Sequence, residues 1–244
     1  MINNNMHPAA KFFEENGWVK IEKVIDENIA FILYNHIKFA VTRLSTLGKN
    51  LGYDNFHEDV WGTFADKQAP GDFSRYGDLI FDTVMVLITE QMEQYTNKKL
   101  IPTYTYHRLY TKGTELKRHK DRPSCEISTT MCLGYDIDNL DKSKRENWNW
   151  PMFLGPKTGE KASKGTPVHL NPGDMIIYKG CDVEHWREPF IGNNHAQVFL
   201  HYNEKDGKNN ILYDGRQFIG LPKKIEYAET RVKETIEKNK QKVY

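Results

Sequence analysis

The N-terminal part of the chain carries apolar residues at helical spacing. In residues 26–48 they recur three and four positions apart after Asp26, which predicts a capped helix that ends near Gly48. Residues 78–99 repeat the spacing and predict a second helix. Pro102 follows, where the chain is expected to become extended.

Shorter patterns flank these two helices. Residues 12–16 predict a short amphipathic helix, followed by a turn at Asn16-Gly17 and an alternating strand over 18–24. Residues 49–75 are rich in Gly, Asp and aromatic residues without a clear period, and we interpret them as a loop.

After Pro102, short extended runs separated by Gly, Pro and Asn predict a β-rich region. These runs lie at 103–113, 114–121, 125–136, 151–155, 167–180, 182–186 and 196–203. Many short strands at close spacing favour a sandwich or barrel. From Pro222 the pattern predicts a charged, solvated helix. We therefore expect a single domain over 1–244: a helical support region (1–100), a β core (101–204) and a C-terminal extension (205–244).

Composition argues against several kinds of partner. The chain has 34 Lys and Arg against 33 Asp and Glu, so no global field favours nucleic acid or an anionic membrane. No apolar run has the length of a membrane span and no signal peptide is visible, so we expect a soluble, cytoplasmic protein. The three cysteines form no CxxC pair, which suits a reducing compartment.

The segment HKDRPSCEIS (119–128) contains the pair that indicates chemistry. On a strand, residues two apart share a face and lie roughly 6.5 to 7 Å apart, so His119 and Asp121 can converge on one metal ion. A His-x-Asp pair alone is usually a surface pair. His185, after the PGD turn at 172–174 and the strand MIIY, adds a third donor. We expect MIIY to run beside the His119 strand in a closed jelly roll.

Together, His119-x-Asp121, the later His185 and the helices before a short-stranded β core resemble the iron(II)/2-oxoglutarate-dependent dioxygenases. The similarity is strongest to their prolyl 4-hydroxylase-like branch and covers residues 100–204 best. It implies a mainly β fold with flanking helices (α+β), with a double-stranded β-helix (jelly-roll) core. It also implies Fe(II) held by His119, Asp121 and His185, 2-oxoglutarate and O2 as cosubstrates, and ascorbate as a supporting reductant.

The sequence offers several candidates for the residue that would hold the far carboxylate of 2-oxoglutarate. This family usually places a cation about ten residues past the second histidine, where a buried carboxylate needs a charged donor. Here His195 occupies that spacing, and no Lys or Arg lies between Glu188 and Tyr202. The nearest cation is Arg187, which we prefer, ahead of Arg108 and then His195.

The remaining candidates have both a structural and a functional interpretation. Tyr110, nine residues before His119, matches the family's cosubstrate-contacting tyrosine and would share a strand face with Arg108. His201, on the last predicted strand, is a weaker candidate for a cosubstrate contact. Basic residues around the motif favour a solvated face over an anion site, and Trp148 and Trp150 suit a core as well as a substrate groove.

The resemblance implies an enzyme that hydroxylates a protein or peptide side chain, with proline first. A small-molecule or nucleobase hydroxylase of the same family is the alternative. The non-enzymatic alternative is a cupin-like metal-binding module, which would need the histidines but no keto-acid pocket.

Overall fold

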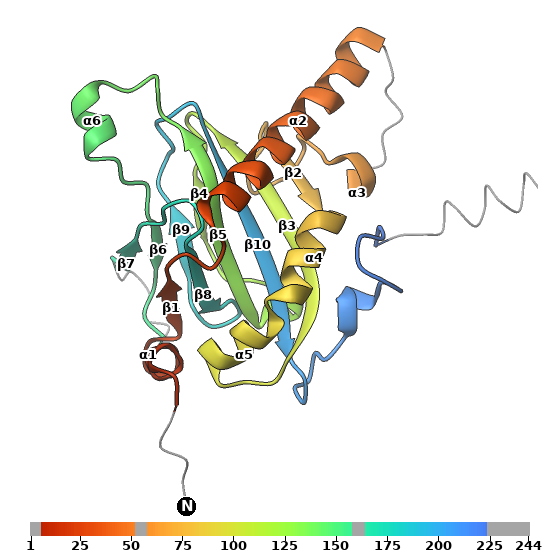
Figure 1. Ribbon diagram of the computed structural model, residues 1–244, viewed down its shortest axis with the longest axis vertical. Coiled ribbons are helices and arrows are strands. Elements are labelled where there is room, and N and C mark those ends of the chain that lie inside the picture. The colour runs from red at the N-terminus through yellow and green to blue at the C-terminus, as the bar shows by residue number, and fades with distance from the viewer. Residues whose placement is uncertain (1–5, 52–57, 158–163, 224–244) are drawn as a thin grey trace, which may run out of the picture.

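In the computed structural model, which describes residues 6–51, 58–157 and 164–223, two antiparallel sheets face one another (Figure 1). The six-stranded sheet has the order β1 (Trp18–Ile21), β8 (Met175–Lys179), β5 (Ile127–Asp136), β10 (Asn194–Glu204), β3 (Leu100–Thr111) and β2 (Phe73–Tyr76). The four-stranded sheet has the order β4 (Leu116–His119), β9 (His185–Arg187), β6 (Met152–Leu154) and β7 (Thr166–Val168).

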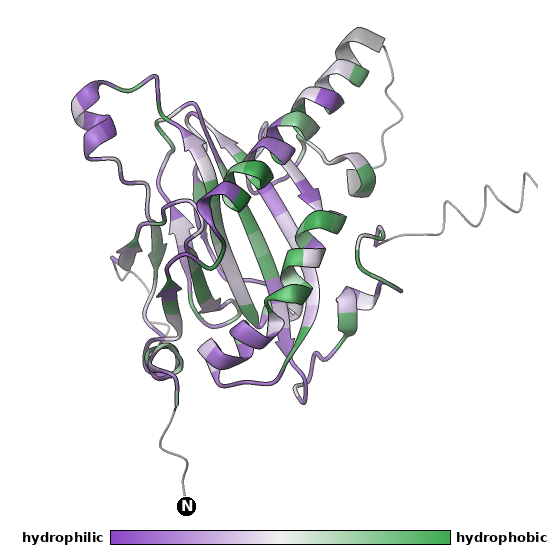
Figure 2. Ribbon diagram, in the orientation of Figure 1, coloured by the Kyte–Doolittle hydropathy of each residue, from purple (hydrophilic) through white to green (hydrophobic). Residues whose placement is uncertain are grey.

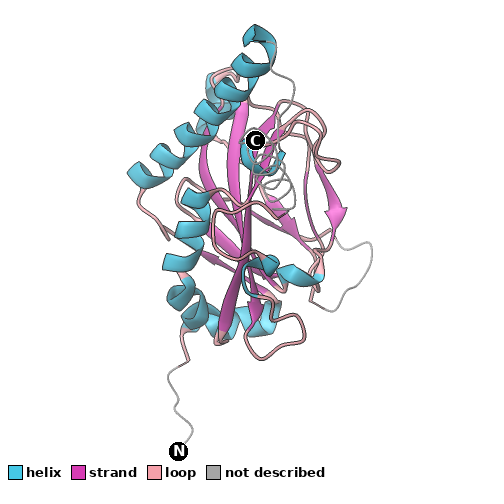
Figure 3. Cartoon of the chain, turned by 90° about the vertical axis from the view of Figure 1, so that its right-hand side faces the viewer, coloured by secondary structure: helices cyan, strands magenta, loops and turns pink. Residues whose placement is uncertain are grey.

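Helices cover one face of the six-stranded sheet (Figures 1 and 3). The covering helices are α2 (Glu27–Leu51), α4 (Leu79–Leu87) and α5 (Thr89–Thr96), with α1 (Pro8–Asn16) beside α5 and β1. Two short helices, α3 (Glu58–Trp61) and α6 (Lys142–Glu146), lie in connections, and single 3-10 turns occupy η1 (Pro123–Cys125) and η2 (Leu212–Gly215). Figure 2 shows the apolar stretches of α4 and of the central strands.

The central strands are apolar on both faces because each face packs against a different layer. In β8, Met175 and Ile177 point into the core beneath the helices. Ile176 and Tyr178 point into a second core between the two sheets. Successive side chains of a strand face opposite ways, so the continuous apolar run MIIY is what a strand buried on both faces requires.

Most predicted elements are present with small shifts. The Asp26 cap is confirmed, since its carboxylate accepts from the Asn28 N–H at 2.8 Å. The helix it caps continues past Gly48, and the predicted helix over 78–99 is divided at Ile88 into α4 and α5. The predicted loop 49–75 contains β2, which adds an edge strand beside β3. The helix expected beyond Pro222 lies outside the described residues.

A buried ion pair attaches the segment after β10 to the helical layer. Arg216 donates to the Asp82 carboxylate at 2.7 Å, and neither side chain is exposed to solvent. The Gly220 N–H donates to the same carboxylate at 2.8 Å. This attachment places Asp214 beside Arg122, which binds it at 2.9 Å near the mouth of the β core. No helix within the described residues is long and apolar enough to span a membrane.

His107, on β3, lies under α4 between the rings of Phe73 and Phe81. Neither ring nitrogen has a hydrogen-bond partner among the described residues. Burial lowers the pKa of His107 to about 3. The neutral imidazole is therefore the form that the folded protein accommodates.

We expect His107 to make the protein less stable in acid. An unfolded histidine takes up a proton near pH 6.5, whereas folded His107 does so only near pH 3. Between these values the free energy of unfolding should fall as the pH falls, by about 1.4 kcal/mol per pH unit from this residue. His107→Phe should remove that slope in urea unfolding measured from pH 7 to pH 4. His7→Phe, at an exposed histidine, is the control. If His107→Phe and His7→Phe show the same dependence of the free energy of unfolding on pH, this assignment is contradicted.

Candidate active site

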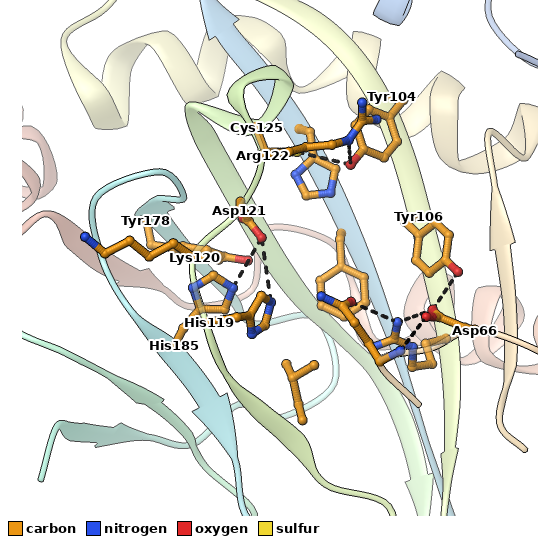
Figure 4. A pocket seen from close by; sticks show the side chains of 15 residues that line it. Asp66, Tyr104, Tyr106, His119, Lys120, Asp121, Arg122, Cys125, Tyr178 and His185 are labelled. Atoms are coloured by element: carbon orange, nitrogen blue, oxygen red, sulfur yellow. Dashed lines mark hydrogen bonds and ion pairs between the residues drawn. The ribbon is translucent and has the colours of Figure 1, made fainter. Parts of the chain in front are cut away.

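The two histidines of the predicted triad lie directly opposite each other on neighbouring strands. Strands β4 and β9 are antiparallel, and His119 pairs with His185 in their register. Asp121 follows two residues after His119 and turns toward both rings (Figure 4). Its Oδ1 atom lies 3.4 Å from His185 Nε2 and 3.8 Å from His119 Nε2. The expectation that MIIY would run beside the His119 strand is wrong, because β8 lies in the other sheet and β9 takes that place.

Backbone carbonyls orient both rings. His119 Nδ1 lies 2.7 Å from the Lys117 carbonyl, and His185 Nδ1 lies 3.0 Å from the Val183 carbonyl. A carbonyl only accepts, so each Nδ1 carries a hydrogen, and Nε2 is the nitrogen left to bind a metal. Such outer hydrogen bonds fix the tautomer of metal-binding histidines.

Asp121 is held as a carboxylate. Burial opposes its ionisation, but the neighbouring His185 ring and the Ser128 hydroxyl outweigh burial and hold the pKa of Asp121 below its usual range. Burial lowers the pKa of His119, with His185 adding to the effect, so the His119 imidazole is favoured in its neutral form. A carboxylate beside a neutral imidazole is the protonation state that metal binding requires.

The donor set fits a divalent metal ion. One ligand atom from each of the three residues lies within 4.8 Å of the others. Two atoms that each lie about 2.1 Å from one ion are at most about 4.2 Å apart. Both nitrogen-to-Oδ1 distances, 3.4 and 3.8 Å, are below that limit, and the two histidine nitrogens lie within 4.8 Å of each other. Two imidazoles and one carboxylate are the ligand set of the facial triad in non-haem iron(II) sites, so these three residues would suit such a metal.

A hollow of about 370 Å³ opens in front of the triad. Tyr104 and Tyr106, both on β3, line it, with Arg122 beside Tyr104 and Asp66 beside Tyr106 (Figure 4). Arg108 is also among the lining residues. Its size is within the range of small-ligand sites. Most of the side chains that line it are polar, so an occupant can be oriented by hydrogen bonds.

Arg108 lines this hollow but already has an anionic partner. Its guanidinium forms an ion pair with Asp66, a residue of the segment that was predicted to be a loop, and donates to the Tyr110 hydroxyl at 3.2 Å. Arg108 and Tyr110 share one face of β3, as predicted, and Tyr106 lies on the same face. Because Asp66 compensates its charge, Arg108 is less suited than an unpaired cation to a second carboxylate.

Arg187 lies deeper and lacks such a partner. Two residues after His185, it is 2% exposed and packs over the ring of Trp150 at 4.6 Å. Its Nη1 donates to the Trp150 carbonyl at 3.0 Å, whereas Nε and Nη2 have no partner among the described residues. Burial lowers the pKa of Arg187. The nearby Glu184 forms its ion pair with Arg118.

Tyr110 and His195 both contact the ring of Trp150, the ring over which Arg187 packs. The Trp150 ring lies 5.2 Å from Tyr110 and 4.9 Å from His195. Burial, with Arg187 nearby, holds the pKa of His195 well below its usual value, so this imidazole is neutral. The structure thus gathers Arg187, Tyr110, His195 and Trp150 at the inner end of the β core. From the sequence, Trp150 was interpreted only as a core residue or as part of a substrate groove.

Ser128 and His201 were not predicted as parts of the metal site. Ser128 donates to Asp121 Oδ2 at 2.7 Å, and His201 lies beside Ser128. No spacing rule connects these residues, because they lie on β5 and β10 and meet only through sheet pairing. Among the other histidines, His7 caps α1 and His36 bonds Asp78, while His57 lies outside the described residues.

Comparison with known proteins gives the fold. No family model matches the sequence, and no curated protein matches it. Among solved structures, a prolyl-4-hydroxylase from Pseudomonas putida superposes with a TM-score of 0.52 at 14% identity, over 80% of this chain and 97% of that one. HygX from Streptomyces hygroscopicus, solved with nickel and 2-oxoglutarate bound, gives 0.55 at 10% identity, over 83% and 89%. A Trichoplax adhaerens prolyl hydroxylase, in complex with a hypoxia-inducible-factor peptide, gives 0.53 at 13%, over 83% and 89%.

The chain has the fold of the iron(II)/2-oxoglutarate oxygenases. The jelly-roll core with flanking helices is therefore confirmed, as is the structural resemblance to the prolyl 4-hydroxylase-like branch. One fold hosts many reactions, so chemistry must be argued from the site.

Gly180 leaves the space that Asp121 occupies. A Cβ built on Gly180 would lie 2.5 Å from Asp121 Oδ2 and 2.6 Å from Ser128 Oγ. We expect Gly180→Ala to lower the free energy of unfolding by about 1 to 3 kcal/mol, because the added methyl displaces these groups. Urea unfolding of this variant against Gly155→Ala, whose added Cβ comes no nearer than 3.3 Å to its neighbour, measures the effect. Equal, small losses in both variants would show that the Gly180 turn can relax.

Proposed function

We propose that this protein is an iron(II)- and 2-oxoglutarate-dependent oxygenase that hydroxylates its substrate. One observation carries the proposal: a His119, Asp121 and His185 donor set lies in the same β core as Arg187, a buried guanidinium with two donor atoms that have no partner in the described part of the chain. The donor set suits iron(II), and the guanidinium suits the far carboxylate of a keto acid.

The proposed reaction assigns each residue a task. His119 Nε2, His185 Nε2 and Asp121 Oδ1 would hold the metal, which supplies the oxygen-activating chemistry when 2-oxoglutarate and O2 are present. Arg187 would bind the far carboxylate of 2-oxoglutarate, and Tyr110 would add a neutral hydrogen bond. The buried Trp150 and His195 rings would exclude water from this end of the site. Two-electron oxidation of 2-oxoglutarate to succinate and CO2 would balance insertion of one oxygen atom into the substrate.

The Arg187 guanidinium, which has no anionic partner among the described residues, also separates this proposal from a non-catalytic metal-binding module. Such a module needs the two histidines and the carboxylate, but it gains nothing from an uncompensated cation inside the β core. Burying a charge without a partner is costly. Arg187 is better explained by an anionic ligand that completes its bonding.

For the substrate we propose a protein or peptide side chain, with proline first. The hollow opens beside the triad and is lined by polar groups such as Tyr104 and Tyr106, which could form hydrogen bonds with the backbone of a bound peptide. Structural neighbours that are prolyl hydroxylases, one of them in complex with a peptide, support this class at the level of the fold. A small molecule or a nucleobase is the second candidate, since the cavity also fits a compact ligand. The free cysteines support a cytoplasmic location.

The test of the proposed function is succinate formation. Wild-type protein supplied with iron(II), 2-oxoglutarate, O2 and ascorbate should form succinate, and more in the presence of a true substrate. His119→Ala, Asp121→Ala and His185→Ala should each abolish this turnover, because each removes one of three metal ligands. Circular dichroism should stay unchanged, and His7→Ala should keep full activity. Full activity in a triad variant would remove that residue from the site.

A second prediction tests the cosubstrate anchor. Arg187→Ala should weaken 2-oxoglutarate binding by about 2 to 5 kcal/mol, the cost of truncating one partner of a buried charge pair. That loss is roughly 30-fold or more in Kd. Tyr110→Phe should cost about 1 kcal/mol, since it deletes one neutral hydrogen bond.

Calorimetric titration of 2-oxoglutarate into metal-saturated protein measures both variants. Arg187→Lys keeps the charge and should lie between wild type and Arg187→Ala. Normal affinity in Arg187→Ala, together with a large loss in Arg108→Ala or His195→Ala, would move the anchor to the residue that failed.

A further inference from the structure

A hydrogen-bonded chain joins the metal-facing carboxylate to a histidine on the far strand. Ser128 on β5 and His201 on β10 lie directly opposite each other in the sheet register. The Ser128 hydroxyl lies 2.7 Å from Asp121 Oδ2 and 3.0 Å from His201 Nδ1. Ser128 is fully buried, and His201 is 5% exposed.

The hydrogens of this chain can be assigned from the chemistry of its members. Asp121 is a carboxylate and only accepts, so the single hydroxyl hydrogen of Ser128 points to Oδ2. The Cys125 carbonyl, 3.2 Å from the same hydroxyl, is the more distant acceptor. The Ser128 oxygen then accepts from His201 Nδ1, which must carry the imidazole hydrogen. A neutral ring agrees with burial, which lowers the pKa of His201 to about 4.

The two oxygens of Asp121 therefore have different partners. Oδ1 is the atom that approaches the Nε2 atoms of His119 and His185. Oδ2 is directed away from them toward Ser128. Gly180 lies behind Oδ2, where it leaves room for this oxygen because it has no side chain, and a Cβ there would collide with Oδ2. The carboxylate is thus fixed in one rotational position.

We infer that Ser128 and His201 are positioning residues that reserve Oδ2 of Asp121, so that the carboxylate offers the metal one oxygen only. Ser128 does so directly. His201 orients the Ser128 hydroxyl, and its own ring is held against Tyr104, 4.5 Å away. Single-oxygen ligation keeps one more position on the metal open for ligands. His201 also lines the hollow, so the chain runs from the wall of the hollow to the metal ligand.

This inference rests on the proposed metal site, and cobalt(II) tests the two separately without requiring turnover. The apparent Kd and the visible d–d absorption spectrum of cobalt(II) would be measured on the full-length protein. Ser128→Ala should weaken binding by roughly 10- to 100-fold, as loss of outer hydrogen-bond partners does, and should alter the spectrum. Ser128→Thr keeps the hydroxyl and should restore both toward wild type.

The His201 step has its own pair of variants. In His201→Asn the side-chain amide can donate in place of Nδ1, so its cobalt spectrum should resemble that of wild type. His201→Leu removes the donor and should shift the spectrum in the direction of Ser128→Ala. If His201→Leu matches wild type while Ser128→Ala does not, the role of His201 is overturned and Ser128 acts alone.

A neighbouring hydroxyl provides the matched control. Thr129 is the next residue on β5 and accepts a hydrogen bond from the Leu200 N–H at 3.0 Å. Thr129→Val deletes this buried hydroxyl without touching the metal site, so it should lower stability but leave the Kd and the spectrum unchanged. An unchanged Kd and spectrum in Ser128→Ala, or an equal loss in Thr129→Val, would overturn the inference. Failure of wild-type protein to bind cobalt(II) would remove the metal site and this inference together.

Discussion

The site depends on one backbone register, the direct pairing of His119 with His185 between β4 and β9. Side chains alternate along a strand, so a slip by one residue would turn one imidazole away from the other. Strand β4 is short and lies at the edge of its sheet, and its register is irregular between Leu116 and His119. Contacts outside the sheet must therefore fix it. The hydrogen bond from the Asp121 N–H to the Gly180 carbonyl, at 2.8 Å, is one of them.

The sequence predicted the features that depend on local spacing. The His119-x-Asp121 pair shares a face because strand geometry requires it, and the helix after Asp26 begins where its capping chemistry indicates. The strands were recognisable because turn residues separate them. The run MIIY was correctly assigned to a buried strand, but its neighbour was not, since an apolar run carries no information about which strand pairs with it.

The features that spacing could not predict are those made by tertiary contacts. Asp66 reaches Arg108 from a segment with no periodic signal, whereas Arg187 has no anionic partner among the described residues. Ser128 meets Asp121 only after the sheet has formed. Ile88 divides a helix that has no Pro or Gly to announce a break. In each case the deciding energy lies in packing between distant segments, which overrides local propensity.

The unpaired donors of Arg187 have a consequence for the protein in the cell. An enclosed charge without a counter-ion penalises the folded state, so the folded protein is less stable than it would be with an anion bound to Arg187. On the proposed function, the dicarboxylate 2-oxoglutarate would bind Arg187 and supply the missing partner. A ligand that binds only the folded form shifts the folding equilibrium by mass action. The amount of intact protein would then follow the supply of the keto acid, and a starved cell would lose the enzyme to proteolysis as well as its turnover.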